Sequence, residues 1–280
     1  MNKALIALTA ILVSTSCVSQ NKQQENQLPM NQTTLTLNNG VVIPQFGLGV
    51  YSIPAGETTY NSVLAALKAG YRHIDTAHAY GNERSVGEAV RDSGIPRDSI
   101  WITSKLWPNE YGEEITPKQL DKMLDRLGLE YLDLVYLHQP LRDYNGGWKA
   151  LEAALDAGKV RAIGISDFDF DDDLFNSIVE PARIKPQMFQ IECHPYAQRE
   201  HWQEMAKKYN IQIECWFPLV AATATARSSA TRSSTLSPRP TASPPPRSSS
   251  AGTCRKASAW FPAPPTPSTS RRTSRSSTSS

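Results

Sequence analysis

Four residues capable of proton transfer stand at or just after the ends of apolar runs. Asp75 and Tyr80 follow the run that opens residues 71–83, YRHIDTAHAYGNE, while Lys105 and His138 close the runs IWITSK and LDLVYLH. Tyrosine and lysine have reference pKa values of ~10 and ~10.4, so neither donates a proton readily near neutrality when alone. An ammonium beside a phenol favours the phenolate, so Lys105 is expected to lower the pKa of Tyr80 toward the working range.

The four residues together predict a site that protonates a carbonyl oxygen while another group delivers a hydride. We expect Asp75 to hold Lys105 through a charge-assisted hydrogen bond, and His138 to donate to the same substrate oxygen as Tyr80. Each residue also has an ordinary explanation on its own: a cap, a loop aromatic, a solvated lysine or a core histidine. Their joint occurrence favours chemistry. Three other histidines are assigned to structure: His73, His194 and His201.

Short β-branched runs alternate with amphipathic patterns between residues 46 and 219. The predicted strands are residues 46–50, 71–74, 100–104, 132–137, 161–165, 188–191 and 211–215. The predicted helices are residues 58–69, 83–93, 117–127, 147–157, 171–178 and 198–209. Such alternation predicts a parallel sheet covered by helices. It favours an α/β fold, a (β/α)8 TIM barrel truncated after about the seventh strand.

In a barrel of this kind, chemistry lies at the carboxyl ends of the strands. Ser166 and Asp167 close AIGIS and Gln190 lies in QMFQIE, so polar groups recur at one edge of successive strands. Ahead of the barrel, TLTLNNGVVI has two alternating runs around Asn39-Gly40, which predicts a β-hairpin. We expect this hairpin to close the bottom of the barrel.

The sequence resembles the aldo-keto reductases from about Thr34 to Leu219. The motifs GLGVY, HIDTAHAYGNE, SKLW, LHQP, GKVRAIGIS and QIECHPY occur in the family's order. LHQP followed by residues 143–148 and GKVRAIG looks most like bacterial members related to 2,5-diketo-gluconate reductases. The resemblance implies a catalytic tetrad of Asp75, Tyr80, Lys105 and His138, with Tyr80 as the acid in carbonyl reduction.

The resemblance also implies a cofactor and a substrate. NADPH is expected, with NADH as the alternative, and the substrate would be a small aldehyde or ketone. The nicotinamide would be held by four residues: Ser166, Asp167, Gln190 and Trp216, the last stacked on its ring. Tyr51 and Trp107 follow strand ends and are predicted to be walls of the substrate pocket.

Two positions depart from the family pattern and predict weaker cofactor binding. Asp167 stands where the family usually has Asn. A carboxylate accepts from the carboxamide NH2 but cannot donate to its carbonyl, so one hydrogen bond is lost. Val50 stands where a hydroxyl residue is common near the nicotinamide.

The N-terminus, MNKALIALTAILVSTSC, has the basic, apolar and small-residue order of a bacterial secretory signal. Residues 1–17 are predicted to be a lipoprotein-like signal with Cys17 as the lipidated residue, and residues 18–32 a linker. This predicts a protein of the bacterial cell envelope, lipid-anchored or periplasmic. If translation starts at Met30, the protein is cytoplasmic, where reduced nicotinamide is available.

Residues 33–220 are assigned to the barrel and residues 221–280 to a low-complexity tail. Nine of the 29 basic residues and none of the 27 acidic residues follow Glu214, so residues 1–214 carry 20 bases against 27 acids, a net charge of −7. The tail is rich in Ser, Thr, Pro and Arg, which predicts disorder. Read one nucleotide out of phase, it can spell family-like text, so we also hypothesise a frameshift near residues 219–221. Loss of strand eight would leave strands seven and one with unpaired edges and open the barrel interior to water.

Composition and spacing bound the remaining possibilities. The basic tail alone gives no argument for nucleic acid, no spacing of His, Asp or Glu suggests a metal, and the cysteines show no CxxC. We expect a monomer that contacts the membrane only through an N-terminal lipid anchor. Two alternatives stay open: an inactive lipid-anchored pseudoenzyme or non-functional truncated product, and a barrel that uses Lys105 to form a Schiff base.

Overall fold

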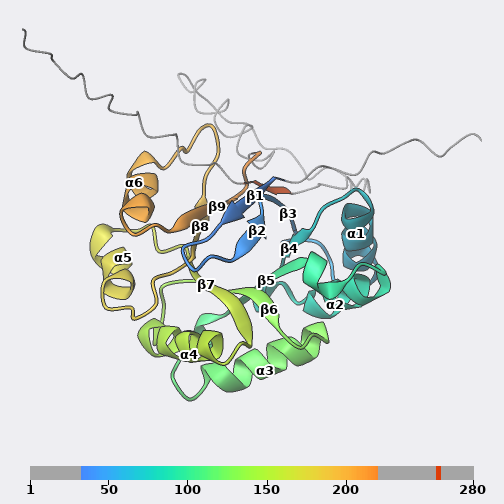
Figure 1. Ribbon diagram of the computed structural model, residues 1–280, viewed down its shortest axis with the longest axis horizontal. Helices are drawn as coiled ribbons and strands as arrows, with labels where there is room; N and C mark the ends of the chain where they lie inside the picture. Colours follow the sequence, from blue (N-terminus) through green and yellow to red (C-terminus); the bar gives the residue numbers. More distant parts are fainter. Residues whose placement is uncertain (1–32, 220–256, 260–280) are drawn as a thin grey trace, which may run out of the picture.

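The computed structural model describes residues 33–219 and 257–259, in which seven parallel strands form most of a ring (Figure 1). The parallel strands are β3 (Phe46–Gly49), β4 (His73–Asp75), β5 (Trp101–Leu106), β6 (Leu132–Leu137), β7 (Val160–Ser166), β8 (Met188–Glu192) and β9 (Gln212–Trp216). The predicted strands and the barrel architecture are confirmed. The ends differ by a few residues, since the strand predicted at 71–74 runs from His73 to Asp75.

Helices surround the ring on its outer side (Figure 1). They are α1 (Glu57–Lys68), α2 (Glu83–Asp92), α3 (Thr116–Leu127), α4 (Tyr144–Asp156), α5 (Asp172–Val179) and α6 (Glu200–Lys208). Short 3-10 helices lie in three loops: η1 (His78–Tyr80), η2 (Arg97–Ser99) and η3 (Pro108–Glu110). Each predicted helix corresponds to one of the six α-helices.

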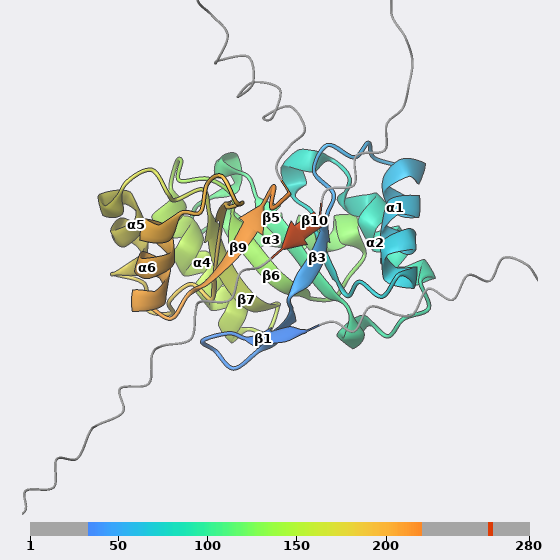
Figure 2. The same ribbon diagram turned by 90° about the horizontal axis from the view of Figure 1, so that it is seen from above.

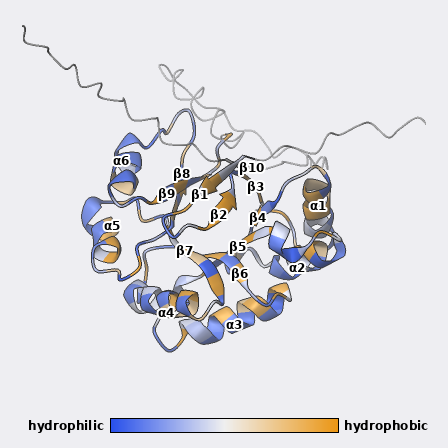
Figure 3. Cartoon of the chain, viewed as in Figure 1, coloured by the Kyte–Doolittle hydropathy of each residue, from blue (hydrophilic) through white to orange (hydrophobic). Residues whose placement is uncertain are grey.

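Helix α3 shows why these segments pack on the sheet. Leu120, Met123, Leu124 and Leu127 recur at helical spacing and are buried, while the opposite side of the helix is polar (Figure 3). Burying each such side chain contributes roughly 1.5–3 kcal/mol. The helix ends at Gly128, whose φ of 64° is a left-handed conformation that suits glycine.

The N-terminal hairpin covers the end of the barrel opposite the loops that follow the strands (Figure 2). Strands β1 (Thr34–Thr36) and β2 (Val42–Pro44) pair antiparallel around the predicted turn. Leu37 and Ile43 pack against apolar side chains of the barrel interior: Trp101, Leu134, Tyr136, Ala162 and Met188. Asn38 and Asn39 donate hydrogen bonds of 2.9 and 3.0 Å to backbone carbonyls of Pro186 and Arg161. The predicted position of the hairpin is confirmed.

The prediction that the first and seventh parallel strands, β3 and β9, have unpaired edges is wrong, because a further strand pairs with the backbone of both. Strand β10 (Ala257–Ala259) lies between β3 and β9 and closes the ring. It runs antiparallel to both and pairs along β3 from Phe46 to Leu48. With β9, the described part of the chain has one residue pair, Ala259 with Cys215. Exposed edge N–H and C=O groups accept any extended segment that reaches them, which explains how a strand foreign to the parallel order fills the gap.

The predictions for the signal, the linker, Cys17 and the disordered or frameshifted tail fall mainly outside the described residues. Within the part of the chain that is described, no helix is long and apolar enough to cross a membrane.

Candidate active site

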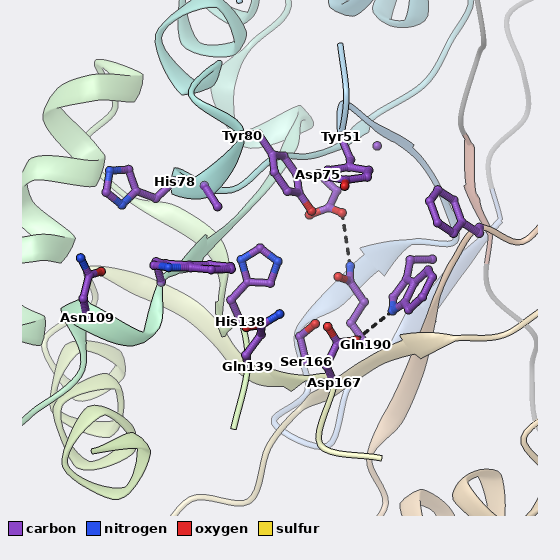
Figure 4. A pocket seen from close by; sticks show the side chains of 15 residues that line it. Tyr51, Asp75, His78, Tyr80, Asn109, His138, Gln139, Ser166, Asp167 and Gln190 are labelled. Atoms are coloured by element: carbon purple, nitrogen blue, oxygen red, sulfur yellow. Dashed lines mark hydrogen bonds between the residues drawn. The ribbon is translucent and has the colours of Figure 1, made fainter. Parts of the chain in front are cut away.

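The carboxyl ends of the strands surround a cavity of about 690 Å³ (Figure 4). Nine predicted site residues line it: Tyr51, Asp75, Tyr80, Trp107, His138, Ser166, Asp167, Gln190 and Trp216. The tenth, Lys105, lies fully buried beside Asp75 and Tyr80. The structure therefore brings together all the predicted residues of the catalytic, cofactor and substrate sets.

Lys105 and Asp75 form a buried ion pair on adjacent strands β5 and β4. The Lys105 ammonium donates hydrogen bonds to Asp75 Oδ1 and, at 3.0 Å, to the backbone carbonyl of Thr76. Burial by itself lowers the pKa of Lys105, but the charge and hydrogen bond of Asp75, together with the neighbouring Tyr80 and Glu214, outweigh it and raise the pKa, so the ammonium keeps its charge near neutrality. Because Lys105 is buried and committed to this pair, the geometry disfavours a Schiff base with a substrate.

Tyr80 is fixed by the short helix η1 and by the residue that follows it. Gly81 ends η1 in the left-handed region, with a φ of 69°. Buried Asn82 then accepts from Thr76 Oγ1 at 2.7 Å and donates to the carbonyls of Val50 and Ile53 at 3.0 and 3.1 Å. These hydrogen bonds join the loops after β3 and β4, and so determine where the phenol lies.

The expected fall in the pKa of Tyr80 is not what the structure gives. The Lys105 ammonium, 5.1 Å from the centre of the Tyr80 ring, does lower this pKa. Burial is the stronger effect, the negative charge of Asp75 adds to it, and together they raise the pKa of Tyr80 to about 12. The phenol is therefore protonated near neutrality, which is the form that an acid in carbonyl reduction requires.

His138 follows β6 and reaches the same cavity. Its ring meets Tyr80 and Trp107 edge-on, with centroids 5.8 and 5.1 Å apart. Burial, aided by the charge of Lys105, lowers the pKa of His138 to about 3, so the imidazole is neutral. A neutral imidazole has one N–H, and it can donate that hydrogen to a substrate oxygen. Nδ1 of His138 is buried without a hydrogen-bond partner among the described residues.

Ser166 and Gln190 are register partners at the ends of β7 and β8. Gln190 Nε2 donates to Asp75 Oδ2 at 3.2 Å, which ties the predicted cofactor residues to the ion pair (Figure 4). Figure 4 shows both side chains on the opposite wall of the cavity from Tyr80.

Asp167 adopts a φ of 60°, a left-handed conformation that Asp and Asn tolerate better than most residues. Its carboxylate accepts a 3.0 Å hydrogen bond from Trp216 Nε1. Burial raises the pKa of Asp167 to about 6, against the opposing effect of the Trp216 hydrogen bond. The indole is thus oriented by the residue that departs from the family pattern.

Aromatic rings form much of the cavity wall, including some that sequence reasoning missed. The ring of Tyr51 lies 5.1 Å from that of Tyr80 and 6.3 Å from that of Phe217. Phe217, His78, Asn109 and Gln139 also line the cavity. His78 and Gln139 lie within the motifs HIDTAHAYGNE and LHQP that marked the site, so membership of these motifs was the available signal. Val50 does not line the cavity. Its side chain is fully buried in the larger apolar cluster, and its predicted effect on cofactor binding stays a prediction.

The histidines assigned to structure occupy structural positions. His73 is buried in the barrel interior and its Nε2 lies 2.9 Å from Thr103 Oγ1. His194 forms an isolated bridge with Ala197, and His201 contacts Asp172 near the start of α6. None of the three lines the cavity.

Comparison with known proteins identifies the family to which this chain belongs. The profile described as "Aldo/keto reductase family" matches residues 46–252. The chain belongs to this family. The match extends beyond Leu219, where we placed the end of the resemblance, and the resemblance to the 2,5-diketo-gluconate reductase subgroup stays a prediction.

Several aldo-keto reductase relatives are similar over most of the described barrel. The chain is 42% identical over 190 residues to a 9,11-endoperoxide prostaglandin H2 reductase of Trypanosoma cruzi, covering 68% of this chain and 66% of that one. It is 43% identical over 188 residues to a glyoxal reductase of Bacillus subtilis, covering 67% of each. A solved aldo/keto reductase from Brucella melitensis superposes with a TM-score of 0.65 at 38% identity, covering 72% of this chain and 79% of that one.

The matched segment is a part of each relative. It spans 66% of the Trypanosoma cruzi protein and 62% of an uncharacterized oxidoreductase, C8E4.04, of Schizosaccharomyces pombe. Activity, substrate and cofactor of this aldo-keto reductase chain are therefore proposals.

Proposed function

We propose that the chain reduces small aldehydes or ketones to alcohols, with NADPH as the expected reductant and NADH as the alternative. The observation that carries this proposal is the buried Lys105–Asp75 pair beside the Tyr80 phenol, with neutral His138 facing the same cavity. The relatives named as reductases support it at the level of reaction class.

The chemistry of the donor set fits the nicotinamide end of such a cofactor. A carboxamide needs both acceptors and donors, which Ser166, Gln190 and Asp167 supply from one wall of the cavity. The indole of Trp216, held by Asp167, offers a flat face for the ring. Bound there, the cofactor would supply the hydride, and the protein would supply position and electrostatics.

The chain's own residues would supply the proton. Tyr80, protonated near neutrality, would donate its hydrogen to the carbonyl oxygen as that oxygen gains negative charge. Lys105 would stabilise the phenolate left behind, because its ammonium is fixed by Asp75 and cannot turn away to solvent. His138 would orient the oxygen through its single N–H.

The walls of the cavity favour substrates with apolar or aromatic substituents. Tyr51, Trp107 and Phe217 line it together with the proton donor. In the reverse direction Tyr80 would act as the base, consistent with a relative named morphine 6-dehydrogenase from Pseudomonas putida, 39% identical over 188 residues.

Turnover of NADPH by the full-length chain with a panel of small aldehydes and ketones tests the proposal. Tyr80→Phe is expected to abolish reduction and leave the fold unchanged, because it removes only the donor oxygen. Tyr60→Phe, which removes a hydroxyl bound to Asp92 away from the cavity, is the matched control. Substantial activity of Tyr80→Phe would contradict the assigned acid. Failure of the wild-type chain to bind NADPH or NADH would favour the alternative, an inactive product.

A further inference from the structure

A layer of buried polar side chains lies inside the barrel between the candidate active site and the apolar floor made with the hairpin. Side chains two residues apart on a strand share a face, so His73 lies below Asp75 on β4, and Glu214 lies below Trp216 on β9. Four members of the layer have no exposed surface: His73, Thr103, Tyr136 and Glu214. The proposed proton transfer uses none of them directly.

Two glycines make room for the rings of this layer. A Cβ on Gly164 would lie 2.5 Å from Tyr136 Cε1 and 2.7 Å from the carbonyl oxygen of Met188. A Cβ on Gly47 would lie 2.9 Å from Cγ and Nδ1 of His73. The backbone of two strands is therefore shaped around the two rings that contact Glu214.

The carboxyl group of Glu214 has one strong partner. Its Oε2 accepts a 2.5 Å hydrogen bond from the Tyr136 hydroxyl. Its Oε1 has no hydrogen-bond partner within reach among the described residues, and lies 3.8 Å from Nε2 of His73. Burial lowers the pKa of His73 to about 3, so this contact joins two uncharged groups and is not an ion pair.

Ionising a buried carboxyl is costly even when it accepts a hydrogen bond, so Glu214 retains its proton near neutrality. Burial, then the charge of Asp75, raises the pKa of Glu214 to about 8, against the lowering effects of Tyr136, Lys105 and Gln190. With Glu214 neutral, the charged groups that act on it are one cation, Lys105, and one anion, Asp75, which balance each other. Ionisation would add a second negative charge. The titratable side chains that contact Glu214 or act on its pKa come from β4, β5 and β6: His73, Asp75, Lys105 and Tyr136.

Two neighbours, Tyr136 and Gln190, connect Glu214 to the Lys105–Asp75 ion pair. Tyr136 is the register partner of Lys105, whose ammonium lies 6.0 Å from the centre of the Tyr136 ring. Gln190 is the register partner of Glu214 and donates to Asp75 Oδ2. A change in charge or hydrogen bonding at Glu214 therefore reaches both members of the pair.

We propose that Glu214, in its protonated form, is a positioning residue that acts on the Lys105–Asp75 pair through Tyr136 and Gln190, and that loss of its proton weakens proton donation by Tyr80. The added negative charge would hold the Lys105 ammonium away from a developing phenolate and disfavour that phenolate directly. This inference rests on the proposed carbonyl reduction.

The pH profile of kcat/KM for carbonyl reduction by the full-length chain tests the inference. In wild type, kcat/KM should fall by roughly tenfold per pH unit once Glu214 ionises, above about pH 8. Glu214→Gln keeps an acceptor for Tyr136 and cannot ionise. It should retain the rate at pH 7 within about threefold, and its alkaline limb should move upward by about one pH unit or more.

A second variant keeps the test decisive if Glu214→Gln folds poorly. Tyr136→Phe removes the hydrogen bond that lowers the Glu214 pKa, so the alkaline limb should move upward. The matched control is Glu83→Gln, another buried carboxyl, which binds Ser104 and Arg126 outside this layer. It should leave the limb where it is in wild type.

Infrared difference spectroscopy of the chain between pH 7 and pH 10, above the pKa of Asp167 of about 6, gives a readout independent of turnover. In wild type, the C=O band of a protonated carboxyl should disappear as the pH rises. The same band should be missing in Glu214→Gln. A wild-type protein without that band overturns the inference. A wild-type chain that reduces no carbonyl overturns the proposed function. An active wild type whose alkaline limb is unchanged in both variants overturns only the role of Glu214.

Discussion

The Lys105 ammonium lies 5.1 Å from the centre of the Tyr80 ring and donates hydrogen bonds to Asp75 and to the backbone carbonyl of Thr76. The phenol is therefore influenced by a charge that Asp75 holds in place. Both the acidity of Tyr80 and the stability of the barrel interior depend on this pair, and the two contributions can be separated by mutation.

Lys105→Met should abolish turnover and strongly destabilise the fold. It leaves Asp75 as an uncompensated buried carboxylate, which costs about 3–5 kcal/mol. The double variant Lys105→Met/Asp75→Asn should recover much of the stability but none of the activity, because the phenolate still lacks its cation. Urea unfolding and NADPH turnover measure the two effects.

Lys149→Met is the control, since Lys149 and Glu113 form an exposed ion pair on the surface. It should change neither stability nor turnover measurably. A double variant that regains turnover would show that the Lys105 charge is dispensable for catalysis.

Asp167 should make cofactor binding sensitive to pH. Above about pH 6 its carboxylate can only accept hydrogen bonds, whereas below that pH the protonated group can also donate one. NADH, titrated by fluorescence, should therefore bind more tightly as the pH falls through 6, by roughly fivefold for one hydrogen bond.

Asp167→Asn provides the reference for this experiment, because an amide donates and accepts at every pH. Its affinity for NADH should be flat across the same range and match the tighter, low-pH value of wild type. Parallel pH profiles for the two proteins would contradict the role of the Asp167 proton.

Glu214 should make the free energy of unfolding of the protein depend on pH. Its pKa is about 8 in the folded chain against 4.5 ordinarily, so between these values the native state binds more protons than the unfolded state. The free energy of unfolding should therefore decrease as pH rises from about 5 to 8, by up to ~1.4 kcal/mol per pH unit from this group. Glu214→Gln should flatten the profile in urea unfolding, while Glu83→Gln should keep the wild-type slope.

Asn82→Ala should impair turnover without touching the reacting groups. It removes three hydrogen bonds that hold the loops around Tyr80, and displacing the phenol by about 1 Å can cost 10²-fold in rate. We expect kcat/KM to fall by at least about tenfold. Asn61→Ala, on the exposed side of α1, is the control and should behave as wild type.

The floor of the barrel can be tested with neighbouring residues of β2. Ile43 is fully buried and Val42 is half exposed. Ile43→Ala should lower the free energy of unfolding by about 2–4 kcal/mol, whereas Val42→Ala should change it by less than about 1 kcal/mol. Equal effects would mean that the hairpin does not close the barrel as described.

Local patterns in the sequence were sufficient to predict the strands, the helices and the turn at Asn39-Gly40. The spacing of apolar residues and the identity of turn residues depend mainly on local structure. The rule that chemistry lies at strand ends then predicted the cavity residues from Asp75 to Gln190, and the family resemblance added Trp216. The net acidity of Tyr80 was beyond such reasoning, because it depends on how burial, Lys105 and Asp75 compete in three dimensions. Strand β10 was also beyond it, since its antiparallel pairing with β3 and β9 depends on long-range geometry.

The same limit explains why Phe217 and Glu214 were missed. Phe217 has a φ of 52°, an unusual conformation that gives no signal in the sequence and that brings its ring beside Tyr51. Glu214 lies between Ile213 and Cys215 in β9, and only the three-dimensional structure shows that it meets Tyr136 and Gln190.

The junction between β10 and β9 is the most weakly paired part of the described ring. Neighbouring parallel strands such as β8 and β9 are in register over five residue pairs, whereas within the described residues 257–259 β10 pairs with β9 at Ala259 and Cys215 alone. On warming, amide hydrogens along this junction should exchange with deuterium before those of β5 and β6, so that the cylinder unrolls from one line instead of loosening evenly.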